Sequence, residues 1–393
     1  MLLGVTGGIA SYKSAWLARL LTKAGAEVDV IMTRAATEFV GAITFEALTG
    51  RPVHTGLFDA GRPLDHIGLA RRATAIVVAP ATADFIARAA TGQADDLLAA
   101  VLLAATCPAL FVPAMNDHMW AHRQTQQNVG RLRELGHTIV EPETGDLAAG
   151  EGTGPGRMPE PETIFAHIGR LIEPNAGLAG RRVLVTAGPT REPIDPVRFI
   201  SNHSSGKMGF AVAAAAWRRG ATVDLVASAV AEAAPAGAAI HTVATTDDMA
   251  AVVGRLLPEA DLLVMAAAPA DFRPASPSSA KIKKSNAPAA IDLAPTTDIL
   301  ASTRGRRKQG AVIVGFALET NDVLANGRAK LDAKDLDLIA VNDATETGAG
   351  FGVDTNRVTL LSRGGGEEHL PLMSKADVAD AILDRAERLL GAR

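Results

Sequence analysis

Short apolar runs alternate with amphipathic stretches along the first 172 residues of this 393-residue chain. The runs are typical of buried strands, and the stretches between them have the spacing of helices. Strands are expected at 2–6, 27–32, 75–79 and 109–112, and helices at 10–24, 39–48, 85–90, 95–105, 125–135 and 162–172. This alternation predicts a parallel sheet covered by helices on both faces.

The same alternation restarts near residue 182. Strands are expected at 183–185, 222–227, 261–266, 311–316 and 336–341, and helices at 208–219, 247–257, 323–331 and 375–390. Between the halves, residues 174–180 lack periodicity and contain Pro, Asn and Gly, as linkers do. We therefore expect two doubly wound, Rossmann-like (flavodoxin-like) α/β domains, at 1–173 and 181–393.

Residues 186–209 form a long polar stretch between an expected strand and an expected helix. Ordinary connections of this kind have about 2–6 residues. Open α/β sheets hold anionic ligands where a strand ends and a helix N-terminus faces it. The stretch therefore predicts an anion site near Ser204, Ser205 and Gly206, in preference to a mobile surface loop.

A second anion site is expected after the first strand. Gly7-Gly8-Ile9-Ala10-Ser11 offers backbone N–H groups and a hydroxyl at a helix start. The GxGxxG fingerprint is absent, which favours a mononucleotide over a dinucleotide. Thr33, Thr82 and Asn116 follow the next three expected strands, so they should face the same crevice.

Composition and charge limit the expected cellular location and binding partners of the protein. No apolar run approaches the ~20 residues that span a bilayer, and no basic signal segment precedes the first strand. A single cysteine excludes an intrachain disulfide and fits a reducing cytoplasm. A net charge of −4 and 4% aromatic residues argue against nucleic-acid binding. We expect a cytoplasmic protein that binds neither membrane nor nucleic acid.

Residues 2–172 resemble the flavin-containing cysteine decarboxylase family through GGIASYK, DHIGLA, APATAD, GQADDLL, PAMN and GPGRM. The resemblance implies FMN, a catalytic base at His66 and a substrate-carboxylate contact at Asn116. Without it, a surface histidine and a turn-forming asparagine would be the simpler interpretations. The FMN contacts that it implies are Gly7, Gly8, Ile9, Ser11, Thr33 and Thr82.

One position departs from this family. Many relatives have a cysteine as proton donor in the flap before GxGRM, and Ala149 stands there in this chain. Arg157 and Met158 are the other expected flap contacts. The missing donor would be water or Glu151. An alternative is that the first half binds flavin without turnover, as a scaffold or a regulatory subunit.

The stretch TAGPTREPIDPVRFISNHSSGKMG, at 186–209, closely resembles the signature of phosphopantothenate–cysteine ligase, as found in bifunctional bacterial enzymes. The resemblance implies CTP with Mg²⁺, Asn202 acting on an acyl-CMP intermediate, with Arg198 nearby, and Lys281 in amide formation. Asp271 is the implied Mg²⁺ ligand. The implied CTP contacts are Ser204, Ser205, Gly206, Met265, Ala266, Ala267, Asp271, Lys281, Thr297, Asp298, Ile299, Leu300, Phe316, Lys330 and Lys334.

The lysines have a simpler interpretation as solvated charge, both in KIKK (281–284) and at the i,i+4 pair Lys330 and Lys334. Their order around Asp271 and Phe316 favours the ligase.

Together the resemblances imply a bifunctional coenzyme A biosynthesis enzyme whose substrates are 4′-phosphopantothenate, cysteine and CTP. They also imply a homo-oligomer, with decarboxylase trimers and ligase dimers, such as a dodecamer. The absent dinucleotide fingerprint argues against a nicotinamide-dependent enzyme.

Overall fold

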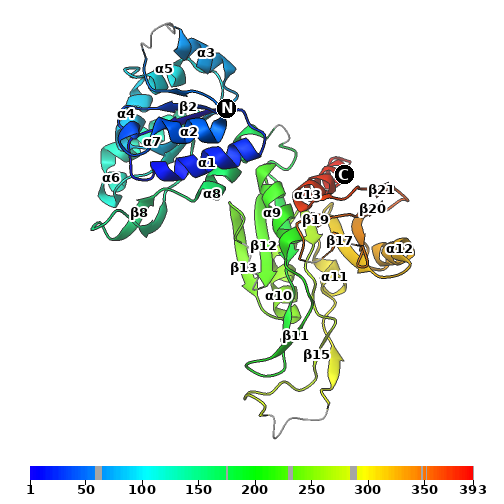
Figure 1. The fold of residues 1–393 in the computed structure, drawn as a ribbon. Coiled ribbons are helices and arrows are strands. Elements are labelled where there is room, and N and C mark those ends of the chain that lie inside the picture. Colours follow the sequence, from blue (N-terminus) through cyan, green and yellow to red (C-terminus); the bar gives the residue numbers. More distant parts are fainter. Residues whose placement is uncertain are drawn as a thin grey trace. The chain divides into compact units, whose positions relative to one another are not determined.

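The computed structural model describes residues 1–57, 64–173, 176–228, 233–283, 290–346, 348–350 and 352–392. The chain divides into two compact units, Met1–Pro174 and Asn175–Arg393, and each unit contains one large sheet (Figure 1). Among the described residues, no helix combines the length and the apolar character that crossing a membrane requires.

The first unit has a six-stranded, wholly parallel sheet in the order β3-β2-β1-β4-β5-β6. The strands are β1 (Leu2–Val5), β2 (Asp29–Met32), β3 (Val53–His54), β4 (Ile76–Ala81), β5 (Ala109–Pro113) and β6 (Thr138–Ile139). The chain runs outward from β1 in one direction and from β4 in the other. The order therefore reverses between β1 and β4, the position where such sheets bind ligands.

Helices cover both faces of this sheet because the strands are apolar on both sides. Leu17 and Ile164 belong to the core cluster on one face, and Leu69 and Phe85 to the cluster on the other. The helices are α1 (Ser11–Lys23), α2 (Ala42–Thr49), α3 (Asp65–Arg72), α4 (Ala83–Thr91), α5 (Leu97–Ala104), α6 (Asp117–Ala121), α7 (Arg123–Glu134) and α8 (Pro161–Ile172). The predicted doubly wound fold is confirmed for this unit.

The glycine-rich stretch before α8 is a hairpin, where the sequence indicated only a polar loop. Strands β7 (Glu143–Asp146) and β8 (Thr153–Arg157) pair in antiparallel fashion, and we call this hairpin the flap. Gly156 has φ 143°, and a Cβ there would lie 2.2 Å from the Met115 carbonyl oxygen. Glycine is therefore needed because the flap crosses directly over the β5–α6 turn.

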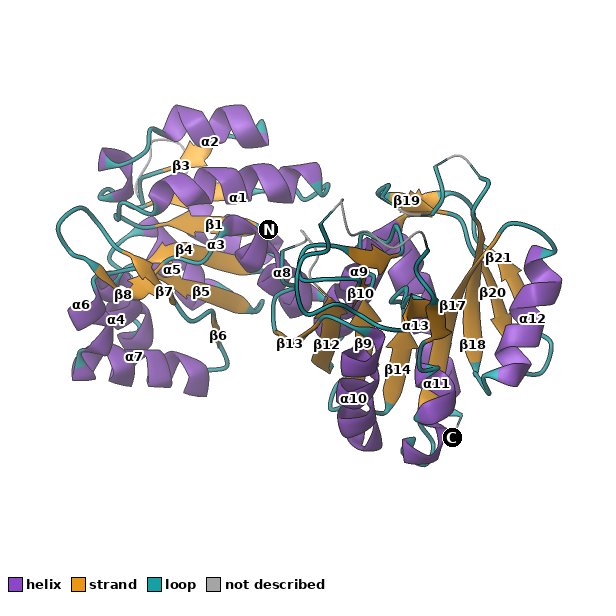
Figure 2. Ribbon diagram, turned by 90° about the horizontal axis from the view of Figure 1, so that it is seen from below, coloured by secondary structure: helices purple, strands orange, loops and turns teal. Residues whose placement is uncertain are grey.

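The second unit has an eight-stranded sheet in the order β13-β12-β9-β14-β17-β18-β20-β21. The strands are β9 (Arg182–Ala187), β12 (Thr222–Ser228), β13 (Ala238–Val243), β14 (Leu262–Met265), β17 (Val312–Glu319), β18 (Leu338–Asp343), β20 (Thr359–Ser362) and β21 (Glu367–His369). β20 is antiparallel to β18, and β21 is antiparallel to β20 (Figure 2). The sequence did not indicate β13, β20 or β21. β13 and β21 are partly exposed edge strands, and β20 is only four residues long, so none of them has a long apolar run.

The helices of this unit are α9 (Lys207–Arg218), α10 (Thr246–Leu256), α11 (Ile299–Ser302), α12 (Val323–Ala333) and α13 (Lys375–Gly391). Helix α9 packs against α13 and β9. Helices α10, α11 and α12 contribute Met249, Ile299 and Leu331 to one core cluster. The short strands β19 (Thr355–Asn356) and β22 (Met373–Ser374) pair just before α13.

Two antiparallel ribbons extend from the sheet of the second unit (Figure 1). Strands β10 (Arg191–Pro193) and β11 (Phe199–Ser201) form the first ribbon, inside the long polar stretch of 186–209. Strands β15 (Phe272–Pro274) and β16 (Leu293–Pro295) form the second. Both ribbons were expected only as loops, since strands of three residues are too short to carry a periodic signal and three of these four contain proline.

Gly209 allows α9 to lie close to the end of β9. A Cβ on Gly209 would be 2.6 Å from the Ala187 Cβ and 2.8 Å from the Thr186 carbonyl oxygen. We expect Gly209→Ala to lower the unfolding free energy of this unit by about 1–3 kcal/mol through overpacking, as measured by denaturant titration. Gly305→Ala is the control, because nothing lies within 4 Å of that Cβ position. Equal stability of the two variants would contradict the close approach.

Candidate active sites

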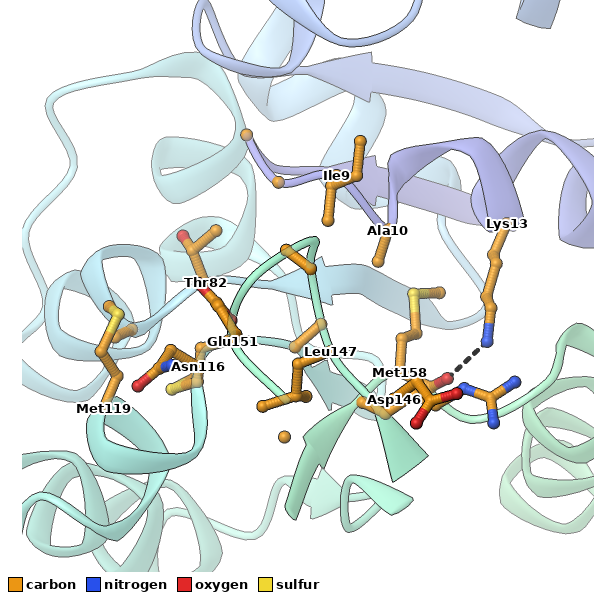
Figure 3. A pocket seen from close by; sticks show the side chains of 18 of the residues that line it. Ile9, Ala10, Lys13, Thr82, Asn116, Met119, Asp146, Leu147, Glu151 and Met158 are labelled. Atoms are coloured by element: carbon orange, nitrogen blue, oxygen red, sulfur yellow. Dashed lines mark hydrogen bonds between the residues drawn. The ribbon is translucent and has the colours of Figure 1, made fainter. Parts of the chain in front are cut away.

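The first unit has a cavity of 380 Å³ at the carboxyl ends of β1, β4 and β5, between the β1–α1 turn and the flap (Figure 3). Its volume is typical of small-molecule sites. The cavity brings together most residues expected to contact FMN or substrate. Those in its lining are Gly7, Gly8, Ile9, Thr82, Asn116, Arg157 and Met158.

Two of the expected FMN contacts are buried behind the cavity wall. The Ser11 hydroxyl donates to the carbonyl oxygens of Thr6 at 3.0 Å and Gly8 at 2.6 Å. Thr33 is buried, and its Oγ1 accepts a hydrogen bond from the Ala36 backbone N–H at 3.3 Å. Neither is among the described lining residues. In this structure they shape the turns that border the cavity.

His66 and Asn116 do not share a described cavity. Asn116 caps α6, where its Oδ1 accepts from the His118 backbone N–H at 2.9 Å. His66 is the second residue of α3 and lines a separate hollow with Leu57, Ile67, Ala94, Ala100, Leu103 and Ala104. Residues 58–63, just before α3, lie outside the described part of the chain. Within one chain, the described cavities therefore do not bring the expected base and the expected carboxylate contact together.

The flap tip contains the position where relatives have cysteine. Ala149 is exposed there, between the cavity-lining residues Ala148 and Glu151. The backbone N–H of Glu151 donates to the Ala148 carbonyl oxygen at 2.9 Å, which closes the turn. Glu151 thus stands at the cavity edge as the nearest acid in sequence to Ala149. The sole thiol, Cys107, is half-buried beside a core cluster, and burial raises its pKa.

Lys13 is a site residue that the sequence analysis missed. It is buried in the first turn of α1 and lines the cavity, and its Nζ donates to the Met158 carbonyl oxygen at 2.7 Å (Figure 3). It also contacts Glu160 at 3.0 Å, and Glu160 forms a second ion pair with Arg157. Lys13 therefore joins the β1–α1 turn to the base of the flap. The sequence could have indicated Lys13, because a lysine at a helix N-terminus is unusual where the helix dipole disfavours a cation.

The second unit has two adjoining cavities, of 370 and 310 Å³, which share Ala267, Pro269, Phe316 and Lys330. Together we call them the ligase crevice, after the resemblance that residues 186–209 carry. One part adjoins the N-terminus of α9, and the other adjoins α11. Asn202 and most expected CTP contacts line the crevice: Ser204, Ser205, Gly206, Met265, Ala266, Ala267, Asp271, Thr297, Asp298, Ile299, Leu300, Phe316, Lys330 and Lys334.

The crevice has anion-binding groups at its α9 end. Gly206 is the N-cap with φ 80°, and the N–H groups of the first helical turn have no partner inside the helix. Lys207, Asn342, Asn356 and Lys375 also line this end, and the sequence analysis missed them. Asn342 had a readable signal, since it is a polar residue at the end of an apolar strand.

The lysines of the crevice are held by ion pairs or carbonyl oxygens. Lys330 Nζ lies 2.6 Å from a Glu319 carboxylate oxygen, and Lys375 Nζ donates to the Gly350 carbonyl oxygen at 3.0 Å. Lys334 pairs with Asp298, the N-cap of α11. Burial opposes ionisation of Asp298, but the hydrogen bond from Lys334 leaves its pKa below the usual value. These contacts fix the cations at the crevice wall.

Asn202 joins two segments at the α9 end of the crevice. Its Nδ2 donates to the carbonyl oxygens of Ala268 at 3.2 Å and Pro269 at 2.9 Å, and so ties the end of β11 to the loop after β14. Two other expected residues lie elsewhere. Of the described residues expected to contact CTP, Lys281 alone lines neither cavity, and Arg198 binds Asp195 and the Ile282 carbonyl oxygen. Lys284 lies outside the described residues.

Two doubly wound α/β units, each with a ligand-sized cavity at the carboxyl ends of its strands, define a two-site enzyme of the nucleotide-binding class. Residues 1–173 match the Flavoprotein family, and residues 178–389 match the DNA/pantothenate metabolism flavoprotein C-terminal domain family. The chain belongs to the family of coenzyme A biosynthesis bifunctional proteins, as its sequence predicted. It is a bifunctional enzyme with a decarboxylase domain and a ligase domain.

The similarity covers nearly the whole chain. The coenzyme A biosynthesis bifunctional protein CoaBC of Mycobacterium tuberculosis is 48% identical over 399 residues, which are 98% of this chain and 95% of that protein. The corresponding protein of Bacillus subtilis is 44% identical over 394 residues, with 99% and 97% coverage. A crystal structure of the C-terminal domain of a CoaBC protein is 36% identical and covers 56% of this chain and 100% of that one, with a TM-score of 0.48.

Proposed function

We propose that the second unit joins cysteine to 4′-phosphopantothenate, using CTP and Mg²⁺, and that the first unit decarboxylates the product, 4′-phosphopantothenoylcysteine, with FMN. The observation that carries the proposal is the ligase crevice, where residues distant in sequence meet at the carboxyl ends of the central strands. Incubation with 4′-phosphopantothenate, cysteine and CTP, followed by mass analysis, tests it. The expected final product is 4′-phosphopantetheine, with release of CMP, pyrophosphate and CO₂.

In the ligase reaction, a carboxylate oxygen of 4′-phosphopantothenate attacks the α-phosphorus of CTP, and pyrophosphate leaves. The cysteine amine then forms the C–N bond, and CMP leaves with the electron pair of the broken C–O bond. The α9 N-terminus and Lys330 would stabilise phosphate charge, and Asn202, which lines the same cavity, would contact the acyl-CMP intermediate. Lys281 would act in amide formation, from outside the crevice of its own chain.

Mg²⁺ would be bound mainly by the nucleotide. Asp271 is exposed at the crevice, and the described residues contain no group of three or more His, Cys, Asp or Glu side chains placed to hold a metal. This arrangement suits Mg²⁺, which keeps several waters and binds one or two carboxylates together with substrate phosphates. We therefore assign Asp271 as a single protein ligand to a nucleotide-bound ion.

Lys330 lines both parts of the crevice, so its loss should weaken CTP binding in particular. We expect Lys330→Met to raise the KM for CTP by about tenfold to a hundredfold, the loss of one charge-assisted contact, with a smaller change in kcat. Steady-state kinetics with varied CTP measure this. Arg328→Met is the control, because Arg328 lies on the same helix and pairs with Glu367. Equal KM values in the two variants would remove Lys330 from the site.

The cavity of the first unit fits a flavin mononucleotide. Gly8 faces Pro80 and Thr82 across this cavity, because a Cβ at Gly8 would lie 3.9 Å from a side-chain carbon of each residue. The N-termini of α1 and α4 both border that space and suit a phosphate. FMN would supply two-electron chemistry at the thiol-bearing carbon, which the substrate needs to lose CO₂. Asn116 Nδ2 would bind the substrate carboxylate.

Arg157 and Lys13 would hold the flap over the bound substrate through Glu160. Glu151, at the cavity edge beside Ala149, would donate the proton that a cysteine donates in many relatives. The competing function, a flavin-binding unit without turnover, rests on Ala149. Yellow protein that forms 4′-phosphopantothenoylcysteine but releases no CO₂ would establish that alternative.

The separation of His66 from Asn116 favours a homo-oligomer. In a closed symmetric assembly, His66 of one chain can face the cavity of its neighbour. We propose decarboxylase trimers and ligase dimers, combined into a dodecamer. The same arrangement would allow Lys281, outside its own crevice, to serve another chain.

A further inference from the structure

A segment carrying Lys281 is docked on the tip of the ribbon formed by β10 and β11. The Ser278 N–H donates to the Ile194 carbonyl oxygen at 2.9 Å. Four residues later, the Ile282 N–H donates to Asp195 Oδ2 at 3.2 Å, and the Ile282 carbonyl oxygen accepts from Arg198 Nη2 at 3.1 Å. These bonds fix the backbone on both sides of Lys281.

Asp195 is the centre of this contact. Its side chain is 0% exposed, yet it accepts from the N–H groups of Val197 and Arg198, both at 2.9 Å, and from Ile282. The Arg198 guanidinium completes the set through Nε at 3.1 Å and Nη2 at 2.5 Å. The hydrogen bond from Arg198 is the main cause that holds the pKa of Asp195 well below its usual range. Asp195 is therefore an ionised, saturated acceptor.

This carboxylate connects two segments that the sequence separates widely. Val197 and Arg198 belong to the turn of the ribbon itself, and those bonds alone would shape that turn. The bond to Ile282 is different, because it reaches the residue directly after Lys281. Asp195 is not among the described residues that line the ligase crevice. Its influence on catalysis must then pass through the position of another residue.

We infer that Asp195 is a positioning residue for amide formation, because it sets the backbone from which Lys281 extends. The inference rests on the proposed role of Lys281. Misplacement of a reacting group by about 1 Å can cost on the order of a hundredfold in rate. Loss of the Asp195 charge should therefore slow the attack of cysteine on the acyl-cytidylate. It should affect acyl-cytidylate formation much less, since the described phosphate-binding groups lie at α9 and α12.

The test uses Asp195→Asn in the full-length enzyme. An amide oxygen is a weaker acceptor than a carboxylate, and the Nδ2 group would face the donors of Arg198. Rapid quench with CTP and 4′-phosphopantothenate measures acyl-cytidylate formation, and later addition of cysteine measures amide formation. We expect amide formation to fall by about tenfold to a hundredfold and the first step by less than about threefold. Amide hydrogen exchange at Ile282 should also become faster.

Two further variants separate the possible outcomes. Asp224→Asn removes another largely buried carboxylate, which pairs with Arg182 and His241. It controls for general destabilisation, which would lower the rates of acyl-cytidylate formation and amide formation together. The double variant Asp195→Asn/Lys281→Gln should be no slower in amide formation than Lys281→Gln alone, because the two residues act through one group.

The failures are distinguishable. If Lys281→Gln forms amide at the wild-type rate, the proposed role of Lys281 fails. If Lys281→Gln is slow but Asp195→Asn behaves like Asp224→Asn, or if the double variant shows additive losses, Asp195 has only a structural role and the inference is overturned.

Discussion

An Asn202→Asp enzyme is expected to form the acyl-cytidylate and to stop there. Asn202 Nδ2 donates to the carbonyl oxygens of Ala268 and Pro269, at the junction of the two parts of the crevice. A carboxylate cannot donate, so it would repel both oxygens and move the loop after β14. The phosphate-binding groups at α9 and Lys330 would remain in place. Amide formation should fall by about a hundredfold or more, because misplacement of reacting groups by about 1 Å has a cost of that order.

Mass analysis of quenched reactions would show the trapped intermediate. The wild-type enzyme should contain little acyl-cytidylate at steady state, whereas the variant should accumulate nearly one per site. Asn321→Asp is the matched control, because Asn321 is exposed and is not among the described lining residues of the crevice. Normal amide formation in the Asn202 variant would withdraw its assignment, and loss of both steps would indicate a damaged fold.

Two variants of the first unit should each lose CO₂ release when expressed alone. They should recover part of it when the two chains are expressed together. His66→Asn removes the expected base, and Asn116→Asp places a negative charge where the substrate carboxylate is expected. Each should lower decarboxylation by about 10²–10⁴-fold, the usual contribution of a general base or of a comparable charge contact. Ligase activity should be spared in both, because the crevice of the second unit is untouched.

Co-expression of the two variants tests whether the site is shared between chains. His66 lies in a hollow apart from the Asn116 cavity within one chain. If a neighbour supplies His66, random mixing restores about one quarter of wild-type sites, namely those that combine the two intact residues. Mixing the purified variants without subunit exchange is the control. A co-expressed assembly that stays inactive would place both residues within one chain or remove one of them from the site.

The parts of the fold that were predictable share one property, which is local burial. Strands such as β4 and β14 are buried along their whole length, so their apolar runs were readable. Gly25 and Gly136, with φ 85° and 87°, likewise occur where the expected helices end. The flap and the two ribbons were not readable, because their strands are short, exposed and rich in glycine or proline. Their pairing depends on partners distant in sequence.

The site residues also fall into two groups, those that the sequence identified and those that it did not. The motifs identified the residues of the ligase crevice, and the sheet order then placed Asp271, Phe316 and Lys330 at one edge. No pattern indicated that Lys13 would support the flap, since its partner Met158 lies 145 residues away. Nor did any pattern indicate that Ser11 and Thr33 would be buried behind the turns they stabilise.

The sequence alone determined the alternation of strands and helices, the two families and the residue types at each site. These depend on short-range periodicity and on motifs contained within a single connection. Only the tertiary structure decided which of those residues meet. The separation of His66 from Asn116, and the attachment of Lys281 to Asp195 through Ile282, follow from strand order and ribbon docking. Such contacts join segments far apart along the chain, so the local pattern of apolar and polar residues does not reveal them.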